Sequence, residues 1–196
     1  MDYLRFSKKR RLEADRILKE TNLFNRLKKF GKVKLIGSYF LDLMIKPDID
    51  FALRVKKNSE IDRVIKEIIG VSKEIKNISL KKIVDRRKFG LNGKSLHLYY
   101  HGKDLWGIDI FVSTNDFSAY NKIGKKIKDK INPKKKRDIL KLKYYFYKKG
   151  KKVHGVPYNI YISVLEDKVS NLKELYQYLN KKFDGQPLNL KRNTFL

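Results

Sequence analysis

Apolar residues recur at helical spacing near both ends of the chain. Over residues 7–30 an apolar residue returns every three or four positions, which predicts a helix with Ser7 as its cap and a break at Thr21-Asn22. The C-terminal part repeats this spacing in three stretches, at residues 134–149, 158–168 and 171–183. Both ends of the chain are therefore expected to be helical.

The middle of the chain has short segments rich in β-branched and aromatic residues, separated by Gly, Pro, Asn and Asp. We predict strands over residues 32–36, 48–55, 80–86, 95–100 and 105–113, the last two forming a hairpin. Ser59 precedes Ile and Val residues at amphipathic spacing, which predicts a helix that ends at Gly70. A short helix over 39–45 is expected to end before Pro47. The pattern predicts an α/β (α+β) fold, with a small mixed sheet flanked by helices and a helical C-terminal part.

Charge adds a hint about partners. The chain has 196 residues, enough for one domain with its own core. Its 48 Lys and Arg against 21 Asp and Glu give a formal net charge of +27. Such a surface attracts polyanions, which favours nucleic acid, nucleotides or anionic lipid. A lysine-rich composition without a dedicated partner gives a similar balance, so charge alone does not set the function.

Several classes of protein and of functional site are excluded because the sequence lacks the residues or segments that they need. There is no cysteine, which excludes a disulfide framework, a thiolate nucleophile and any Cys-ligated metal. No apolar run approaches the roughly 18 residues of a membrane-spanning helix, so no membrane partner is expected. The first residues lack the apolar stretch of a signal peptide. The expected location is the cytoplasm.

Two carboxylates stand side by side in one predicted strand. Residues i and i+2 of a strand project to the same face, so Asp48 and Asp50 point together, while Ile49 and Phe51 point into the core. Paired carboxylates repel each other unless a cation lies between them. Mg²⁺ is typically held by one or two carboxylates and by substrate phosphates, so the pair predicts a divalent-cation site. A pair of surface acids at a turn is the plain alternative.

Gly37 and Ser38 stand where the strand over 32–36 gives way to the short helix. Glycine lets the backbone approach a ligand closely, the start of a helix leaves N–H groups free, and serine adds a hydroxyl donor. Together they predict a phosphate cradle. A helix-capping role for Ser38 is compatible with phosphate binding.

A third acid, Asp109, is the one charge in the apolar strand LWGIDIFVS. An unpaired buried carboxylate is costly, which argues for a partner. Placed beside the strand of Asp48 and Asp50, it completes a three-carboxylate site. Two metal ions about 4 Å apart at such a site clamp the attacking and leaving oxygens of an in-line phosphoryl displacement. From the residues alone, nucleotidyl transfer and hydrolysis both stay open.

This arrangement resembles the DNA-polymerase-beta-type nucleotidyltransferase superfamily. Its pattern is an apolar residue with Gly-Ser, a spacer, an Asp-apolar-Asp-apolar segment and a later Asp on a strand. Over roughly residues 31–115 the chain matches it in order, with Ile36-Gly37-Ser38, a spacer of nine residues, Asp48-Ile49-Asp50-Phe51 and Asp109. Residues 137–143 and 160–165 are similar to the helical tail of small stand-alone members.

The resemblance implies Mg²⁺-dependent transfer of a nucleoside monophosphate from an NTP to an acceptor hydroxyl, with release of pyrophosphate. Mn²⁺ is the alternative ion. By position, Asp48 and Asp50 ligate both metals, and Gly37 and Ser38 hold the phosphates. Asp109 ligates the catalytic metal and helps to deprotonate the acceptor hydroxyl.

The acceptor and the oligomeric state stay open. The charge favours RNA, such as a tRNA end, while an antibiotic-type small molecule or a protein side chain are alternatives. A hypothesis of another class is a non-catalytic RNA-binding protein on the same fold, which binds through the lysines of 121–152 without Mg²⁺ or NTP. Steep loss of binding with rising salt is expected for RNA.

The resemblance also suggests three regions. Residues 1–30 are expected to be a basic helical segment, 31–118 the nucleotidyltransferase catalytic core, and 119–196 a basic connector and helical part. Within the last region, the stretch 121–137 (NKIGKKIKDKINPKKKR) is expected to be an exposed connector.

The remaining candidates are expected to be structural. We expect His97 and His101 to be ordinary polar residues and Arg86 and Arg87 to be solvated. Tyr99, Tyr100 and Trp106 are expected to pack in the core, and Tyr144–Tyr147 to form a helix that packs on the core and is edged by lysines. For His97, contact with substrate is the alternative.

Overall fold

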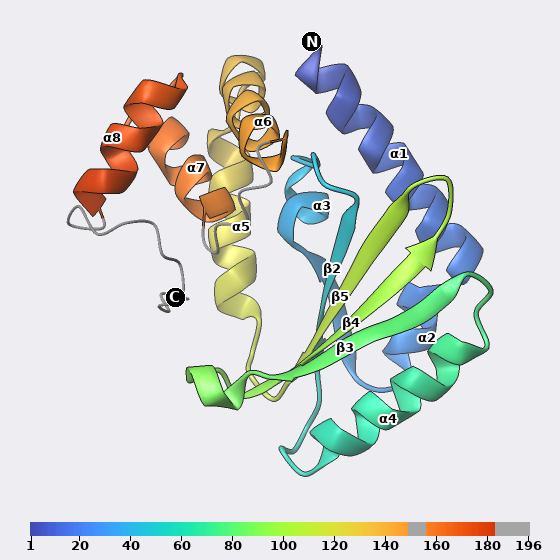
Figure 1. Cartoon of the computed structure of the whole chain (residues 1–196). Helices are drawn as coiled ribbons and strands as arrows, with labels where there is room; N and C mark the ends of the chain where they lie inside the picture. The colour runs from blue at the N-terminus through green and yellow to red at the C-terminus, as the bar shows by residue number, and fades with distance from the viewer. Residues whose placement is uncertain (149–155, 183–196) are drawn as a thin grey trace.

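The computed structural model describes residues 1–148 and 156–182, which form a five-stranded mixed sheet with helices around it (Figure 1). The strands are β1 (Lys32–Ile36), β2 (Asp48–Arg54), β3 (Ile78–Asp85), β4 (Gly93–His101) and β5 (Leu105–Ser113), in the spatial order β1-β2-β5-β4-β3. β2 and β5 pair in parallel, and the other pairs are antiparallel. The predicted mixed sheet and the hairpin of β4 and β5 are confirmed.

Helices precede, interrupt and follow the sheet. They are α1 (Tyr3–Thr21), α2 (Leu23–Lys28), α3 (Gly37–Leu41), α4 (Glu60–Lys73), the 3₁₀ turn η1 (Arg87–Phe89), α5 (Ser118–Lys130), α6 (Pro133–Lys148), α7 (Val156–Leu165) and α8 (Leu172–Lys182). Helices α5 to α8 stand together on the left of Figure 1, and α4 lies below the sheet. Within the described ranges, no helix combines the length and the apolar character needed to cross a membrane.

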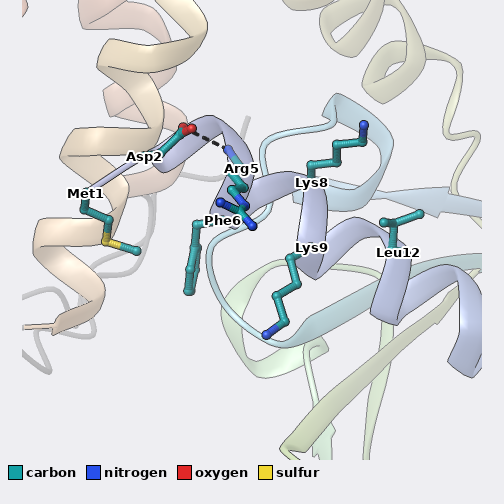
Figure 2. Close-up of a pocket in the computed structure, with 7 residues that line it drawn as sticks. All are labelled: Met1, Asp2, Arg5, Phe6, Lys8, Lys9 and Leu12. Atoms are coloured by element: carbon teal, nitrogen blue, oxygen red, sulfur yellow. Dashed lines mark hydrogen bonds between the residues drawn. The ribbon is translucent and has the colours of Figure 1, made fainter.

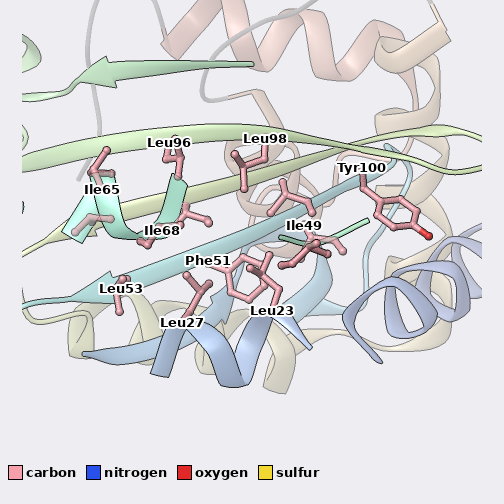
Figure 3. Close-up of a cluster of buried hydrophobic side chains, with 14 of the residues drawn as sticks. Leu23, Leu27, Ile49, Phe51, Leu53, Ile65, Ile68, Leu96, Leu98 and Tyr100 are labelled. Carbon is pink, nitrogen blue, oxygen red and sulfur yellow. The ribbon is translucent and has the colours of Figure 1, made fainter. Parts of the chain in front are cut away.

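One face of the sheet forms the larger apolar core. Alternate residues of β2, β4 and β5 point to it, and α1, α2 and α4 cover it (Figure 3). Phe51 of β2 is 1% exposed and lies with Leu23 and Leu27 of α2. Full burial of such a side chain stabilises the fold by about 2 kcal/mol. This apolar face leaves the opposite face of the same strands for polar residues.

A second apolar cluster joins the C-terminal helices to the segment after α3. Leu43 and Ile45 of that segment are fully buried, and they share the cluster with Leu140 of α6 and Ile160 of α7. The cluster therefore brings the C-terminal helices beside the start of β2, where Asp48 and Asp50 lie.

The N-terminal helix begins earlier than predicted. Asp2, not Ser7, is its cap: the Asp2 carboxylate accepts hydrogen bonds at 3.0 Å from two backbone N–H groups of the first turn. Ser7 lies buried inside the helix instead. The predicted break is confirmed, because Asn22 adopts the left-handed backbone conformation (φ 48°) between α1 and α2.

Three helix boundaries also differ from the prediction. α3 spans Gly37–Leu41 and not 39–45, since Asp42 turns into the left-handed region (φ 56°) and ends the helix. α4 runs past Gly70 to its end at Lys73. Glycine inside a helix costs only about 0.5–1 kcal/mol relative to alanine, so Gly70 does not end α4.

The basic stretch 121–137 is largely helical and not an irregular connector, although most of its lysines are exposed, as expected. It makes up most of α5 and the beginning of α6. Ile123 and Ile127 of α5 pack into the second apolar cluster, while its lysines lie outside. Such a two-sided pattern is typical of an amphipathic helix. The predicted helix ends at residues 149 and 183 lie outside the described residues.

A hollow of about 560 Å³ lies along the first turns of α1 (Figure 2). It is lined by Met1, Asp2, Arg5, Phe6, Lys8, Lys9 and Leu12. None of the residues that the sequence analysis proposed for chemistry lines it, so the candidate site has to be sought on the polar face of the sheet.

Candidate active site

The register of β2 and β5 brings three acids together. Asp50 pairs directly with Asp109, and Asp48 pairs with Gly107. Register partners on adjacent parallel strands point to the same face, so the three carboxylates project together from the face opposite the larger core. The structure thus gathers all three acids that the sequence analysis selected, although they come from strands far apart in the chain.

Local sequence explains why the acids face away from the core. The residues that flank them are large and apolar: Ile49 and Phe51 on β2, Ile108 and Ile110 on β5, each at most 1% exposed. A slip of the pairing by one residue turns every side chain to the other face. Burial of the apolar neighbours therefore fixes the direction of the carboxylates.

Gly37 lies directly against the acid pair. Its φ is +63°, and a Cβ added there would stand 2.2 Å from Oδ2 of Asp50. Both the backbone conformation and the space exclude a side chain at this position. The close approach places the backbone at the start of α3 beside the carboxylate of Asp50, as the strand pairing of Ile36 with Asp50 requires.

Lys143 of α6 reaches into the same region, which the sequence analysis missed. Its ammonium group is buried and donates hydrogen bonds to Ser38 Oγ (2.9 Å), to the Leu43 carbonyl (2.5 Å) and to the Tyr161 hydroxyl (2.9 Å). Expected as one of the lysines edging the helix, it lies on the buried stripe that also holds Leu140. The sequence does contain a sign of this burial: Lys143 comes three residues after the apolar Leu140, so the two side chains share one face of the helix.

Burial and mutual repulsion disfavour the charged forms of Asp48 and Asp50. Burial raises the pKa of Asp50 well above its usual range, the neighbouring Asp48 and Asp109 raise it further, and Lys143 and Lys46 oppose the shift. Burial also raises the pKa of Asp48, against the pull of the same two lysines. Crowded carboxylates with raised pKa values are a common sign of a functional site.

His97 of β4 contacts the third acid. It is the register partner of Asp109, and its Nδ1 lies 2.5 Å from Asp109 Oδ1. Nε2 of His97 is buried and has no hydrogen-bond partner among the described residues. His101, at the end of β4, bonds to Ser79 Oγ instead (2.7 Å). The two histidines that the sequence places four residues apart thus have different surroundings, and only His97 joins the acids.

The donor set fits a hard divalent cation. No three His, Cys, Asp or Glu side chains in the described ranges are already gathered into a metal-binding group. The acids nevertheless present carboxylate oxygens on one face, and Oδ1 of Asp48 is buried with no hydrogen-bond partner among the residues that the structure describes. Mg²⁺ keeps several waters and takes only one or two carboxylates from the protein, so these residues suit it.

The other candidates have structural surroundings. Trp106 and Tyr100 are buried in the larger core, as expected. Arg86 donates to Ser95 Oγ at 2.9 Å, and Arg87 pairs with Asp85. In the aromatic run of α6, Phe146 is buried and Tyr144 packs edge-on against Tyr3 and Phe6.

Comparison with known proteins identifies a fold. No family model matches the chain, and no curated protein matches it. Cid1 poly(U) polymerase with MgGTP bound aligns at a TM-score of 0.59 and 17% identity, over 80% of this chain and 50% of that one. A cytoplasmic RNA terminal U-transferase aligns at 0.55 and 15%, over 84% and 53%. A further Cid1 poly(U) polymerase structure aligns at 0.54 and 18%, over 88% and 56%.

At these identities the likeness establishes the fold alone. The chain spans about half the length of the solved chains that it matches. Its mixed sheet with flanking helices is therefore a nucleotidyltransferase fold like that of the poly(U) polymerase, as the resemblance implied.

Proposed function

We propose that the chain is a nucleotidyltransferase that moves a nucleoside monophosphate from an NTP to an acceptor hydroxyl and releases pyrophosphate. The observation that carries this proposal is the direct register of Asp50 with Asp109, with Asp48 on the same face of the sheet. Similarity of the fold to RNA terminal U-transferases supports it. Because many functions share one fold, the proposal depends on the acids more than on the likeness.

Magnesium is the ion that the proposal requires, with Mn²⁺ as the alternative. Asp48 and Asp50 would hold two such ions, and Asp109 would be a further ligand to one of them. When bound, the ions neutralise charge that develops on the phosphate oxygens during transfer. A structure of Cid1 poly(U) polymerase with MgGTP bound supports this choice of ion.

The chain's own residues bind the nucleotide and move one proton. Gly37 and Ser38 hold the phosphates, with the charge of Lys143 beside the serine hydroxyl. The Asp109 carboxylate accepts the proton of the acceptor hydroxyl. The acceptor oxygen bonds to the α-phosphorus while the α-phosphorus–oxygen bond to the β-phosphate breaks, and pyrophosphate leaves with that electron pair.

RNA is the acceptor class that the proposal favours. The net charge of +27 attracts a polyanion, and the fold resembles proteins that act on RNA ends. A small hydroxylated molecule and a protein side chain are the competing acceptors, and they form separate arms of the test.

A label-transfer assay tests the proposal. Wild type, Asp48→Asn and the exposed control Asp129→Asn are incubated with Mg²⁺ and each α-labelled NTP, with RNA, protein and small-molecule pools offered separately. Label that enters the RNA pool with wild type and Asp129→Asn, but not with Asp48→Asn, supports the proposal. Label in another pool supports the transfer and overturns the RNA acceptor. RNA binding without Mg²⁺ or NTP, and no label in any pool, favours a non-catalytic RNA-binding protein.

A further inference from the structure

One row of side chains crosses three strands on the polar face of the sheet. Asp50 on β2, Asp109 on β5 and His97 on β4 are successive register partners. Cross-strand partners stand about 5 Å apart at Cβ, close enough for neighbouring side chains to bond. Asp109 is therefore flanked by an acid on one side and by an imidazole on the other.

The contact between His97 and Asp109 is directional. A carboxylate can only accept hydrogen bonds, so at 2.5 Å the imidazole Nδ1 carries the hydrogen and donates it to Asp109 Oδ1. The opposite ring nitrogen, Nε2, is buried and has no partner among the described residues. The ring is thus anchored to a polar group through Nδ1 alone.

Asp109 is the more exposed partner of this contact. Its side chain is 44% exposed, whereas that of His97 is 12% exposed. In the described part of the chain, no other hydrogen bond to the Asp109 carboxylate is found beside that from His97. A half-exposed carboxylate with one anchor keeps a fixed direction only while the anchor is present.

We propose that His97 is a positioning residue that orients the Asp109 carboxylate through its Nδ1–H, leaving the second oxygen free for the reaction. The proposal rests on the proposed function, because it assigns a reacting role to Asp109. Groups that orient a metal-binding or proton-accepting side chain typically change activity by about 10–100-fold when removed.

Two amide substitutions separate positioning from packing. The amide nitrogen of Asn stands near the place of the histidine Nδ1, whereas that of Gln stands near the place of Nε2. His97→Asn therefore keeps a donor toward Asp109. His97→Gln fills more of the space but aims its donor where the structure offers no partner. A residue that only packs would show the opposite order.

Nuclear magnetic resonance of the metal-free protein gives a readout without activity. Long-range nitrogen–proton correlations of the imidazole report which ring nitrogen carries the hydrogen, and His97→Gln assigns the signal. We expect hydrogen on Nδ1 in wild type and loss of that preference in Asp109→Ala. Hydrogen on Nε2 alone in wild type would overturn the proposal, because Nδ1 would then have nothing to donate.

Steady-state kinetics complete the test. With an active wild type, His97→Ala and His97→Gln are expected to lower kcat by about 10–100-fold, with KM for NTP changed less than about twofold, and His97→Asn to recover most of kcat. Equal kcat in all variants, or rescue by Gln and not by Asn, overturns positioning while the proposed function stands. A wild type that transfers no nucleotide to any acceptor overturns the proposed function, and the positioning role with it.

Discussion

The ammonium group of Lys143 donates a hydrogen bond to Ser38 Oγ at 2.9 Å, across 105 residues of chain. The same group bonds to the Leu43 carbonyl and the Tyr161 hydroxyl. One buried cation therefore ties two C-terminal helices to the start of α3 and to the segment before the acid pair. It also opposes the raised pKa values of Asp48 and Asp50 by its charge.

Lys143→Met is expected to weaken both the fold and nucleotide binding. Loss of a charged hydrogen-bond donor that leaves buried acceptors unpaired costs about 1–3 kcal/mol. KM for NTP should rise about tenfold, which corresponds to one charge-assisted hydrogen bond. Urea denaturation and steady-state kinetics measure the two effects. Lys141→Met is the matched control, since Lys141 is exposed on the same helix. Identical behaviour of the two variants would contradict this assignment.

Asp50→Asn is expected to stabilise the metal-free protein. The substitution keeps the shape of the side chain and removes a buried charge that is repelled by Asp48 and Asp109. A gain of about 1 kcal/mol corresponds to a rise in Tm of about 2–4 °C for a domain of this size. Thermal unfolding in a chelator measures it, with Asp129→Asn as the exposed control. A lower Tm for Asp50→Asn would show that the charge is not under repulsion.

The difference in unfolding free energy by which Asp50→Asn exceeds wild type should grow as pH rises. A carboxyl whose pKa is raised in the folded chain contributes stability below its unfolded pKa, about 4, and loses it as pH rises through the folded value. Asp50 is such a group. Acids in surface ion pairs, such as Asp85 with Arg87, have lowered pKa values and act in the opposite sense. These surface acids are present in both wild type and Asp50→Asn, so their effects cancel in the difference in stability between the two proteins.

Urea denaturation of wild type and Asp50→Asn in a chelator, at a series of pH values, provides this difference. An advantage that stays constant or shrinks from about pH 4 to about pH 8 would contradict the raised pKa. Saturating Mg²⁺ should make the stability of wild type depend less steeply on pH, because a bound cation stabilises the charged carboxylates.

Gly37→Ala is expected to destabilise the protein and to abolish the proposed nucleotidyl transfer. The residue has φ +63°, and the added Cβ would stand 2.2 Å from Asp50 Oδ2. Backbone strain alone costs about 1 kcal/mol, and the displaced carboxylate adds to it. Gly70→Ala is the control, because its Cβ would meet no atom of the described residues within 4 Å, and replacing a helical glycine by alanine stabilises a helix by about 0.5–1 kcal/mol. Opposite shifts in Tm are therefore expected, and equal shifts would argue against the close approach at Gly37.

The sheet and its acids were predictable because alternation carries the information locally. Ile49 and Phe51 fix the face to which Asp48 and Asp50 point, and Asp109 is marked as a candidate by being the one charge in an apolar strand. These signals need no knowledge of how distant segments meet.

Residues whose role depends on distant partners were not predictable. His97 contacts Asp109 because β4 pairs with β5, and Lys143 reaches Ser38 because the C-terminal helices fold back onto α3. The ends of α3 and the start of α1 were also not predicted. Several polar residues near each position could cap or end a helix, and the sequence does not show that Asp42 and Asp2 do so. A buried lysine resembles a surface lysine in the sequence until its helix face is known.

Thermal unfolding with Mg²⁺ and a non-hydrolysable NTP tests the central claim most directly, because it requires no knowledge of the acceptor. A ligand that binds only the native state stabilises it, by about 2.7 kcal/mol at a hundredfold excess over Kd. We predict a rise in wild-type Tm that requires both Mg²⁺ and nucleotide, is kept in Asp129→Asn, and is lost in Asp48→Asn and Asp50→Asn. No rise in wild type, or an equal rise in all four proteins, would contradict a metal–nucleotide site at these acids.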